Sequence, residues 1–154
     1  MLIRYLAFLF ILVLLSSCRV YDSPAEYKGR QLKYGKGGGV TGAWEQYVLL
    51  GNGQVFYRNF QDTVYAELGY IPRKEAKKIF KGLIDAHFYA ERFNEPGNMT
   101  YFIFYKDNDE SHGLQWGSGT FKTPQSILDL YNRLMKLELK GTKKLKKKDS
   151  SPKK

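Results

Sequence analysis

The segment that most constrains the fold is WEQYVLLGNGQVFYRNF, residues 44–60. Two runs rich in Val, Phe and Tyr flank the sequence Gly51-Asn52-Gly53. This pattern is typical of a β-hairpin, because glycine and asparagine tolerate the positive φ angles of tight turns. The alternating run DTVYAEL that follows, residues 62–68, predicts a third antiparallel strand. We therefore expect this part of the chain to build a sheet.

Two amphipathic helices and a second hairpin complete the predicted domain. In PRKEAKKIFKGLIDAHF, residues 72–88, apolar residues recur at helical spacing and basic residues occupy the other positions. The apolar run 99–105 and the return strand 111–116 flank an Asp-Asn-Asp turn. Pro124 is expected at the start of a last amphipathic helix. The order β-β-β-α-β-β-α predicts an α+β domain over residues 44–139, with an antiparallel sheet of about five strands and both helices packed on one face.

The chain begins with an apolar segment that is typical of an export signal. Residues 5–15 are apolar throughout, follow Arg4 and precede Ser16 and Ser17. The run is too short to span a bilayer, which needs about 20 apolar residues, but it has the length of a signal-peptide core. We expect residues 1–17 to be a signal peptide.

The end of this segment, Leu15-Ser16-Ser17-Cys18, resembles the lipobox of bacterial lipoproteins, in which the cysteine is acylated and becomes the new N-terminus. The resemblance implies that Leu15, Ser16 and Ser17 are recognised during processing and that Cys18 carries the lipid anchor. Cysteine thiolate is a suitable nucleophile for lipid attachment, and a lone cysteine cannot form an internal disulfide. The implied location is the bacterial cell envelope, on the outer membrane facing the periplasm, because Arg19 rather than aspartate follows the cysteine.

Residues 38–138 also resemble small uncharacterised domains of envelope lipoproteins. The shared features are GGGVTG, LGNGQVFYR, PGN, and Trp116-Gly117 followed by TP. These are architectural features, so the resemblance implies a location and a fold but no reaction.

Two further segments differ from the domain in composition. Residues 18–43 contain Pro24 and the cluster GKGGGVTG, and they are predicted to form a flexible tether. Residues 140–154, KGTKKLKKKDSSPKK, hold eight lysines and one aspartate and are predicted to be a disordered tail. This tail either only improves solubility or binds anionic lipid or another acidic envelope polymer. The candidate residues for such binding are Lys143, Lys144, Lys146, Lys147 and Lys148.

The sequence contains no recognisable catalytic or metal-binding motif. The lysines of the tail have no aromatic residues among them, and the export signal also argues against nucleic acid as a partner. His87 and His112 are isolated from one another in the sequence, and zinc sites need three or four ligands at recognisable spacing. We expect a non-catalytic protein without metal or cofactor.

Aromatic residues on the predicted strands are the stronger indication of function. If the helices cover one face of the sheet, some of these residues are expected on the other face, where tyrosine and tryptophan favour binding. We therefore expect a protein-binding or accessory module, of an immunity or inhibitor-like kind, attached to the membrane through Cys18. The alternative is binding of an anionic envelope polymer or lipid surface through the tail. The candidate partner-binding residues are Tyr57, Tyr101, Tyr105 and Trp116.

Overall fold

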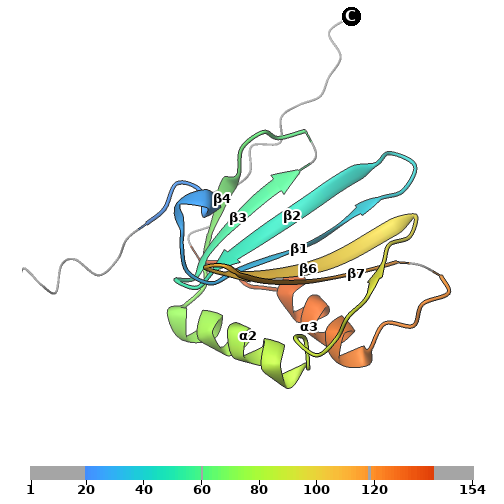
Figure 1. Ribbon diagram of the computed structural model, residues 1–154. Helices are drawn as coiled ribbons and strands as arrows, with labels where there is room; N and C mark the ends of the chain where they lie inside the picture. Colours follow the sequence, from blue (N-terminus) through green and yellow to red (C-terminus); the bar gives the residue numbers. More distant parts are fainter. Residues whose placement is uncertain (1–19, 60, 118, 141–154) are drawn as a thin grey trace, which may run out of the picture.

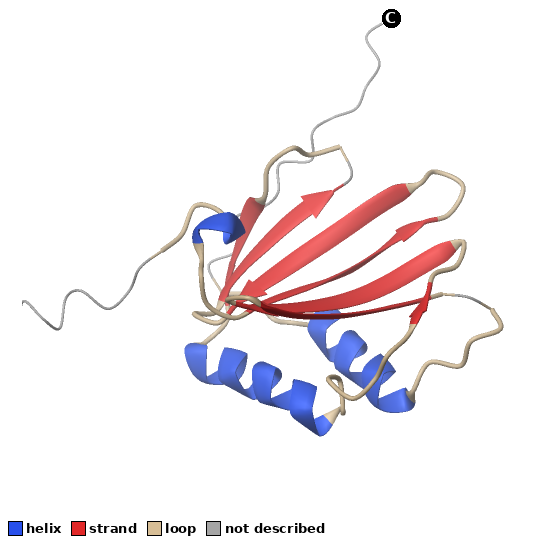
Figure 2. Ribbon diagram, viewed as in Figure 1, coloured by secondary structure: helices blue, strands red, loops and turns tan. Residues whose placement is uncertain are grey.

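A computed structural model describes residues 20–59, 61–117 and 119–140 of the chain. The strands form a seven-stranded sheet in the order β4-β3-β2-β1-β6-β7-β5, and two helices lie together under one face of it (Figures 1 and 2). The elements in chain order are η1 (Pro24–Glu26), β1 (Gln31–Gly38), β2 (Ala43–Leu50), β3 (Gln54–Asn59), β4 (Ala66–Tyr70), α2 (Arg73–Asp85), β5 (Asn94–Glu95), β6 (Met99–Asp107), β7 (Glu110–Trp116) and α3 (Gln125–Met135).

The predicted α+β class with both helices on one face is confirmed, but the predicted sheet is too small. The sheet has seven strands rather than five, because β1 and β5 join the five expected ones. It is also mixed rather than purely antiparallel, since the short edge strand β5 runs parallel to β7.

Both predicted hairpins are present, and each reverses at residues suited to a turn. In the β2–β3 turn, Gly53 has a φ of 101°. The side-chain oxygen of Asn52 accepts a hydrogen bond from the backbone N–H of Gln54 at 3.0 Å. In the β6–β7 turn, Asn108 has a φ of 49°. Glycine and asparagine therefore stand where the chain needs a left-handed conformation.

Strand β1 corrects the predicted tether. The described part of residues 18–43 does not form a free linker, because Gln31–Gly38 is the middle strand of the sheet and pairs antiparallel with β2 on one side and β6 on the other. The side chains of Leu32 and Tyr34 are 0% and 2% exposed and belong to the main core. The folded domain therefore begins well before Trp44.

The glycines of β1 explain why this strand is hard to recognise in the sequence. A Cβ atom on Gly37 would collide with the Trp44 ring, and one on Gly35 would collide with the backbone of Glu45. The Phe102 ring also lies 2.9 Å from the Cβ position of Gly35. Glycine inside a strand commonly marks such a close approach. Aromatic rings of the two neighbouring strands thus occupy the space above β1.

Helices α2 and α3 enclose the main core between themselves and the sheet. Each helix begins one residue after its proline, so Pro72 and Pro124 are the residues before the helices rather than their first residues. The core joins fully buried side chains of the strands to those of the helices. Its members include Leu32, Leu49, Val55, Ile103 and Leu114 from the sheet and Phe80, Leu83, Ile127 and Leu134 from the helices.

Residues 20–30 fold back over one end of the opposite sheet face. Tyr21 and Tyr27 pack against a second, smaller core of Val48, Leu50 and Phe56. The backbone of Tyr21 exchanges two hydrogen bonds with the Gln54 side chain, at 3.0 and 3.1 Å. This segment is therefore a part of the folded domain.

At the other end, Lys140 forms a β-bridge with Tyr70, so the predicted disordered tail is wrong at its first residue. The rest of the tail, with its candidate lysines 143–148, lies outside the described residues, as do the predicted signal peptide and Cys18. Within the described ranges, no helix has the length and apolar character needed to cross a membrane.

Candidate binding site

The four aromatic residues predicted to bind a partner lie on the helix side of the sheet. Trp116 is 5% exposed, and its ring centroid is 5.3 Å from that of Tyr131 in α3. Tyr105 is 9% exposed, and its ring centroid is 6.3 Å from that of Phe80 in α2. Tyr57 and Tyr101 are partly buried against the same core. The prediction that these residues lie on an uncovered face is therefore wrong.

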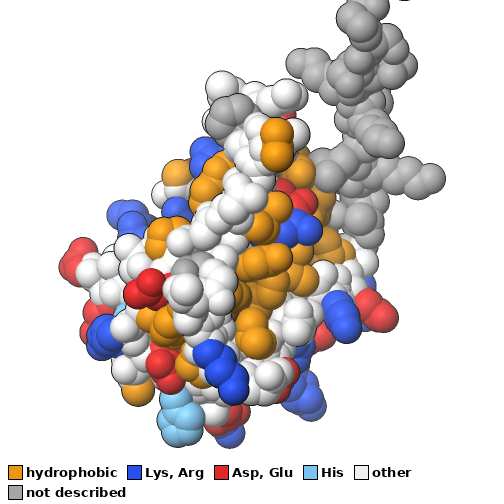
Figure 3. Space-filling view, turned by 90° about the vertical axis from the view of Figure 1, so that its right-hand side faces the viewer, with side chains coloured by type: hydrophobic (Ala, Val, Ile, Leu, Met, Phe, Trp, Pro, Cys, Tyr) orange, Lys and Arg blue, Asp and Glu red, His pale blue; other side chains and the backbone are white. Residues whose placement is uncertain are grey.

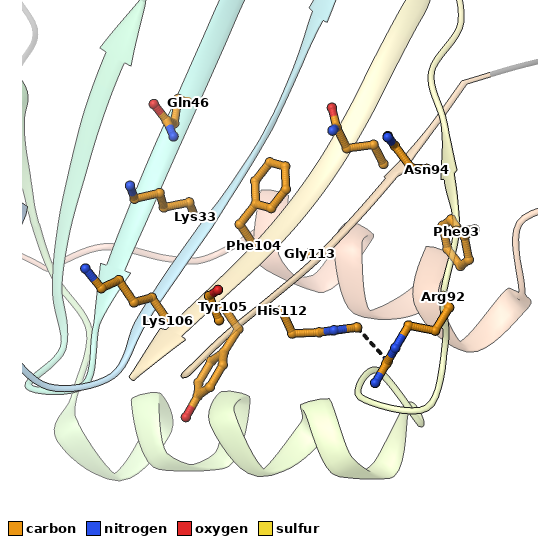
Figure 4. A pocket seen from close by; sticks show the side chains of 12 residues that line it. Lys33, Gln46, Arg92, Phe93, Asn94, Phe104, Tyr105, Lys106, His112 and Gly113 are labelled. Carbon is orange, nitrogen blue, oxygen red and sulfur yellow. Dashed lines mark hydrogen bonds between the residues drawn. The ribbon is translucent and has the colours of Figure 1, made fainter. Parts of the chain in front are cut away.

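The opposite sheet face carries a set of side chains that includes none of these four candidates. Residues paired across antiparallel strands share a face, so the strand register assigns them directly. Lys33 pairs with Phe104, and Gln46 pairs with Arg58. Figure 4 shows Lys33, Gln46, Phe104 and Lys106 above the sheet, whereas Tyr105 points down toward the helices. We call this surface the open face; its exposed or half-exposed side chains include Lys33, Trp44, Gln46, Arg58, Glu67, Phe104, Lys106, Ser111 and Gln115.

Two adjoining hollows lie on the open face. The larger, of about 830 Å³, is lined by Lys33 and Lys106 among others. The smaller, of about 440 Å³, is lined by Trp44 and Arg58 among others. Gln46 and Phe104 line both hollows, which are therefore neighbours on one surface. Their volumes fall in the range of about 300 to 1,000 Å³ that is usual for binding sites.

The floor of the hollows is aromatic. The ring centroid of Phe102 is 5.7 Å from that of Trp44 and 5.5 Å from that of Phe104. A Cβ atom on Gly113 of β7 would collide with the Phe104 ring, just as the other two rings approach the glycines of β1. Glycines on the neighbouring strands thus allow the three rings to lie close over the sheet.

Exposed apolar side chains continue this floor toward the β1–β2 turn and the start of β6. Val40, Trp44 and Met99 are exposed, Trp44 by 39% and Met99 by 38%. Figure 3 looks at the right-hand side of Figure 1, where the β1–β2 turn and the start of β6 lie, and hydrophobic side chains gather in the middle of this view with charged groups around them. Trp44 and Met99 also line a common hollow at this end.

Three cations, Lys33, Arg58 and Lys106, project from the open face, and the described carboxylates that line hollows with them, Asp62 and Asp109, form no ion pair with them. The guanidinium of Arg58 donates to the side-chain oxygen of Gln46 at 3.0 Å and lies 4.6 Å from the ring centroid of Tyr65. Across residues 20–59, 61–117 and 119–140, neither Arg58 nor Lys33 nor Lys106 forms an ion pair. The open face therefore presents three cations that are not engaged in ion pairs within the described residues.

The position of Lys33 on this face disfavours its charged form. Burial lowers the pKa of its ammonium group, and the nearby charges of Lys106 and Arg58 lower that pKa further. Because the fold disfavours the charged form, protonated Lys33 destabilises the native state at neutral pH. The penalty decreases as the pH rises through the lowered pKa toward the ordinary value of 10.5.

We expect the substitution Lys33→Met to stabilise the isolated protein at pH 7. It keeps the length of the side chain and removes the unpaired charge, so the melting temperature should rise by a few degrees, corresponding to about 0.5 to 1 kcal/mol for a partly solvated group. Thermal unfolding at pH 7 and above pH 10 measures this effect. The stabilisation should be smaller at the higher pH, and a loss of stability at pH 7 would contradict the argument.

The two histidines lie in different surroundings. His112 is half-buried, and its ring centroid lies 4.8 Å from that of Phe88. Burial and the charge of Arg92 lower the pKa of His112. His87 is exposed and has a φ of 55°. Among the residues that the structure describes, no three His, Cys, Asp or Glu side chains lie together so as to hold a metal ion.

No model of a known protein family matches the chain, and none of the curated proteins matches it significantly. The candidate site therefore rests on its geometry and charge.

Proposed function

We propose that the chain is a non-catalytic binding module that engages a partner protein through its open face. The observation that supports this most is the difference between the two sides of the sheet. Helices cover one side, whereas the other presents Trp44, Phe104 and Arg58 in adjoining hollows. Exposed Trp and Arg side chains beside an apolar floor are the composition from which binding energy in protein interfaces chiefly comes.

We further infer that the module is held on a membrane of the bacterial envelope by lipid on Cys18, on the outer membrane facing the periplasm. The lipobox-like sequence Leu15-Ser16-Ser17-Cys18 supports this proposal. An accessory subunit, or a protein of an immunity or inhibitor-like kind, needs only a stable surface and an anchor. Neither role requires a metal, a cofactor or a catalytic group.

The partner should be captured by crosslinking the full chain in its own cells, followed by mass spectrometry. We expect Trp44→Ala and Phe104→Ala each to reduce capture by about 30-fold or more, as for the loss of a central interface residue. Ile84→Ala is the matched control, because Ile84 is 65% exposed on α2, on the other side of the sheet. The melting temperature of each variant establishes that it is folded. Undiminished capture by both folded open-face variants would refute the proposed function.

The alternative, binding of an anionic envelope polymer or lipid through the tail, is favoured by one observation, the eight lysines within residues 140–154. Removing residues 141–154 tests it and leaves Lys140 in its bridge with Tyr70. If the tail is the binding element, this deletion should abolish salt-sensitive retention on envelope material. The open-face proposal expects partner capture to survive the deletion.

A further inference from the structure

The charge of the open face restricts what can occupy it. A second copy of the chain placed face to face would bring Lys33, Arg58 and Lys106 of one copy against the same cations of the other. The C-terminal tail of the chain is itself rich in lysine and would be repelled in the same way. Like charges at close range oppose association, whereas complementary charges favour it. An acidic partner is therefore the occupant whose charge complements this surface.

The positions of the three cations add a geometric requirement. Lys33 is paired with Phe104, and Lys106 lies two residues beyond Phe104 on the same face. The backbones at Lys33 and Lys106 are therefore diagonal neighbours, about 8 Å apart. Arg58 lies two strands away from Lys33 and one row of side chains further, at roughly 12 Å. The three residues thus follow a nearly straight diagonal across β6, β1 and β3.

An extended peptide can match this diagonal. Alternate side chains of an extended chain point to the same side and are about 7 Å apart. Two carboxylates on alternate residues would therefore reach Lys106 and Lys33, and a third further along would reach Arg58. The Arg58 guanidinium is already oriented by Gln46, so less conformational freedom is lost when a carboxylate binds.

We propose that the open face binds an extended acidic segment of the partner protein, whose carboxylates on alternate residues pair with Lys106, Lys33 and Arg58 above the aromatic floor. This inference rests on the proposed function and specifies the chemistry of the partner. Bound carboxylates would form the ion pairs that these three cations do not make within the described residues. They also favour the protonated form of Lys33, which the free protein disfavours.

The test is calorimetric titration of the full chain with a peptide of alternating glutamate and serine, and with the same peptide carrying glutamine in place of glutamate. Lysines 143, 144, 146, 147 and 148 are replaced by glutamine throughout, so that the tail cannot capture the acidic peptide. We expect the glutamate peptide to bind and the glutamine peptide not to bind. The double variant Lys33→Gln/Lys106→Gln should raise the dissociation constant about tenfold or more, because charge-assisted hydrogen bonds are lost.

The control is Lys77→Gln/Lys78→Gln, which removes the same charge from exposed positions of α2. Equal weakening by both double variants would mean non-specific attraction and would overturn the inference, as would absence of peptide binding. Lysine-dependent binding of polygalacturonate or of phosphatidylglycerol vesicles, with no binding of the peptide, would overturn it in favour of a glycan or a membrane. If cellular capture depends on Trp44 and Phe104 but not on Lys33 and Lys106, the proposed function stands and this inference fails.

Discussion

Leu32→Ala is expected to lower the free energy of unfolding by about 3 to 5 kcal/mol. Leu32 is 0% exposed and lies on the middle strand of the sheet, where its side chain belongs to the main core. Removing a buried leucine side chain loses its transfer free energy and leaves a cavity between rigid neighbours. Chemical denaturation of the purified variant, monitored by circular dichroism, measures the change.

Val40→Ala is the control for this prediction. Both residues lie in the stretch 18–43 that its composition suggests is a linker, but Val40 is fully exposed in the turn after β1. Its truncation should change stability by less than about 0.5 kcal/mol. If Leu32→Ala were as neutral as Val40→Ala, β1 would not be the central strand.

The second large expected effect is on stability, and it distinguishes the two tryptophans: Trp116 lies in the core, whereas Trp44 lies on the proposed binding surface. Trp116→Ala should cost about 3 to 5 kcal/mol of stability, since its ring is buried beside α3 and contacts Tyr101 and Tyr131. That loss is a large part of the 5 to 15 kcal/mol that stabilises a typical domain, so the variant should accumulate poorly in cells.

Trp44→Ala should cost much less stability than Trp116→Ala, because Trp44 is 39% exposed, and should reduce partner capture instead. Thermal melting of both variants, together with crosslinking of Trp44→Ala, separates the two roles. Reduced capture by a Trp116 variant would not by itself indicate an interface, because an unfolded protein also loses its partners. The assignment would be contradicted if Trp116→Ala melted at the wild-type temperature.

The predicted elements that agree with the structure are those with a strong local pattern. The turn at Gly53 and the periodic apolar residues of the two helices are local features, and local propensity and packing agree there. Strand β1 has no such pattern. Gly35 and Gly37 reduce its strand propensity. Glycine is needed at these positions because the rings of Trp44 and Phe102 on the neighbouring strands approach the backbone closely there, which only the three-dimensional structure reveals.

The face assignment of the aromatic residues failed for a related reason. In β6, both alternating sets are aromatic or apolar, so hydrophobic alternation does not indicate which set faces the helices. Phe102, Phe104 and Lys106 form one set, and Tyr101, Ile103 and Tyr105 the other. The charged residues at the end of β6 do not decide it either, because Lys106 shares the face of Phe104 whereas Asp107 shares that of Tyr105.

The folded segment over residues 20–30 also limits how far this domain can stand from a membrane. Tyr21 is already packed against the domain, and only three peptide steps separate it from Cys18, a contour of about 10 Å at most. If Cys18 carries the proposed lipid, the end of the sheet at Val48 and Phe56 is held at the level of the lipid headgroups. The open face is then also held close to the bilayer, so proteins embedded in or attached to the same membrane meet it at a higher effective concentration than freely diffusing ones.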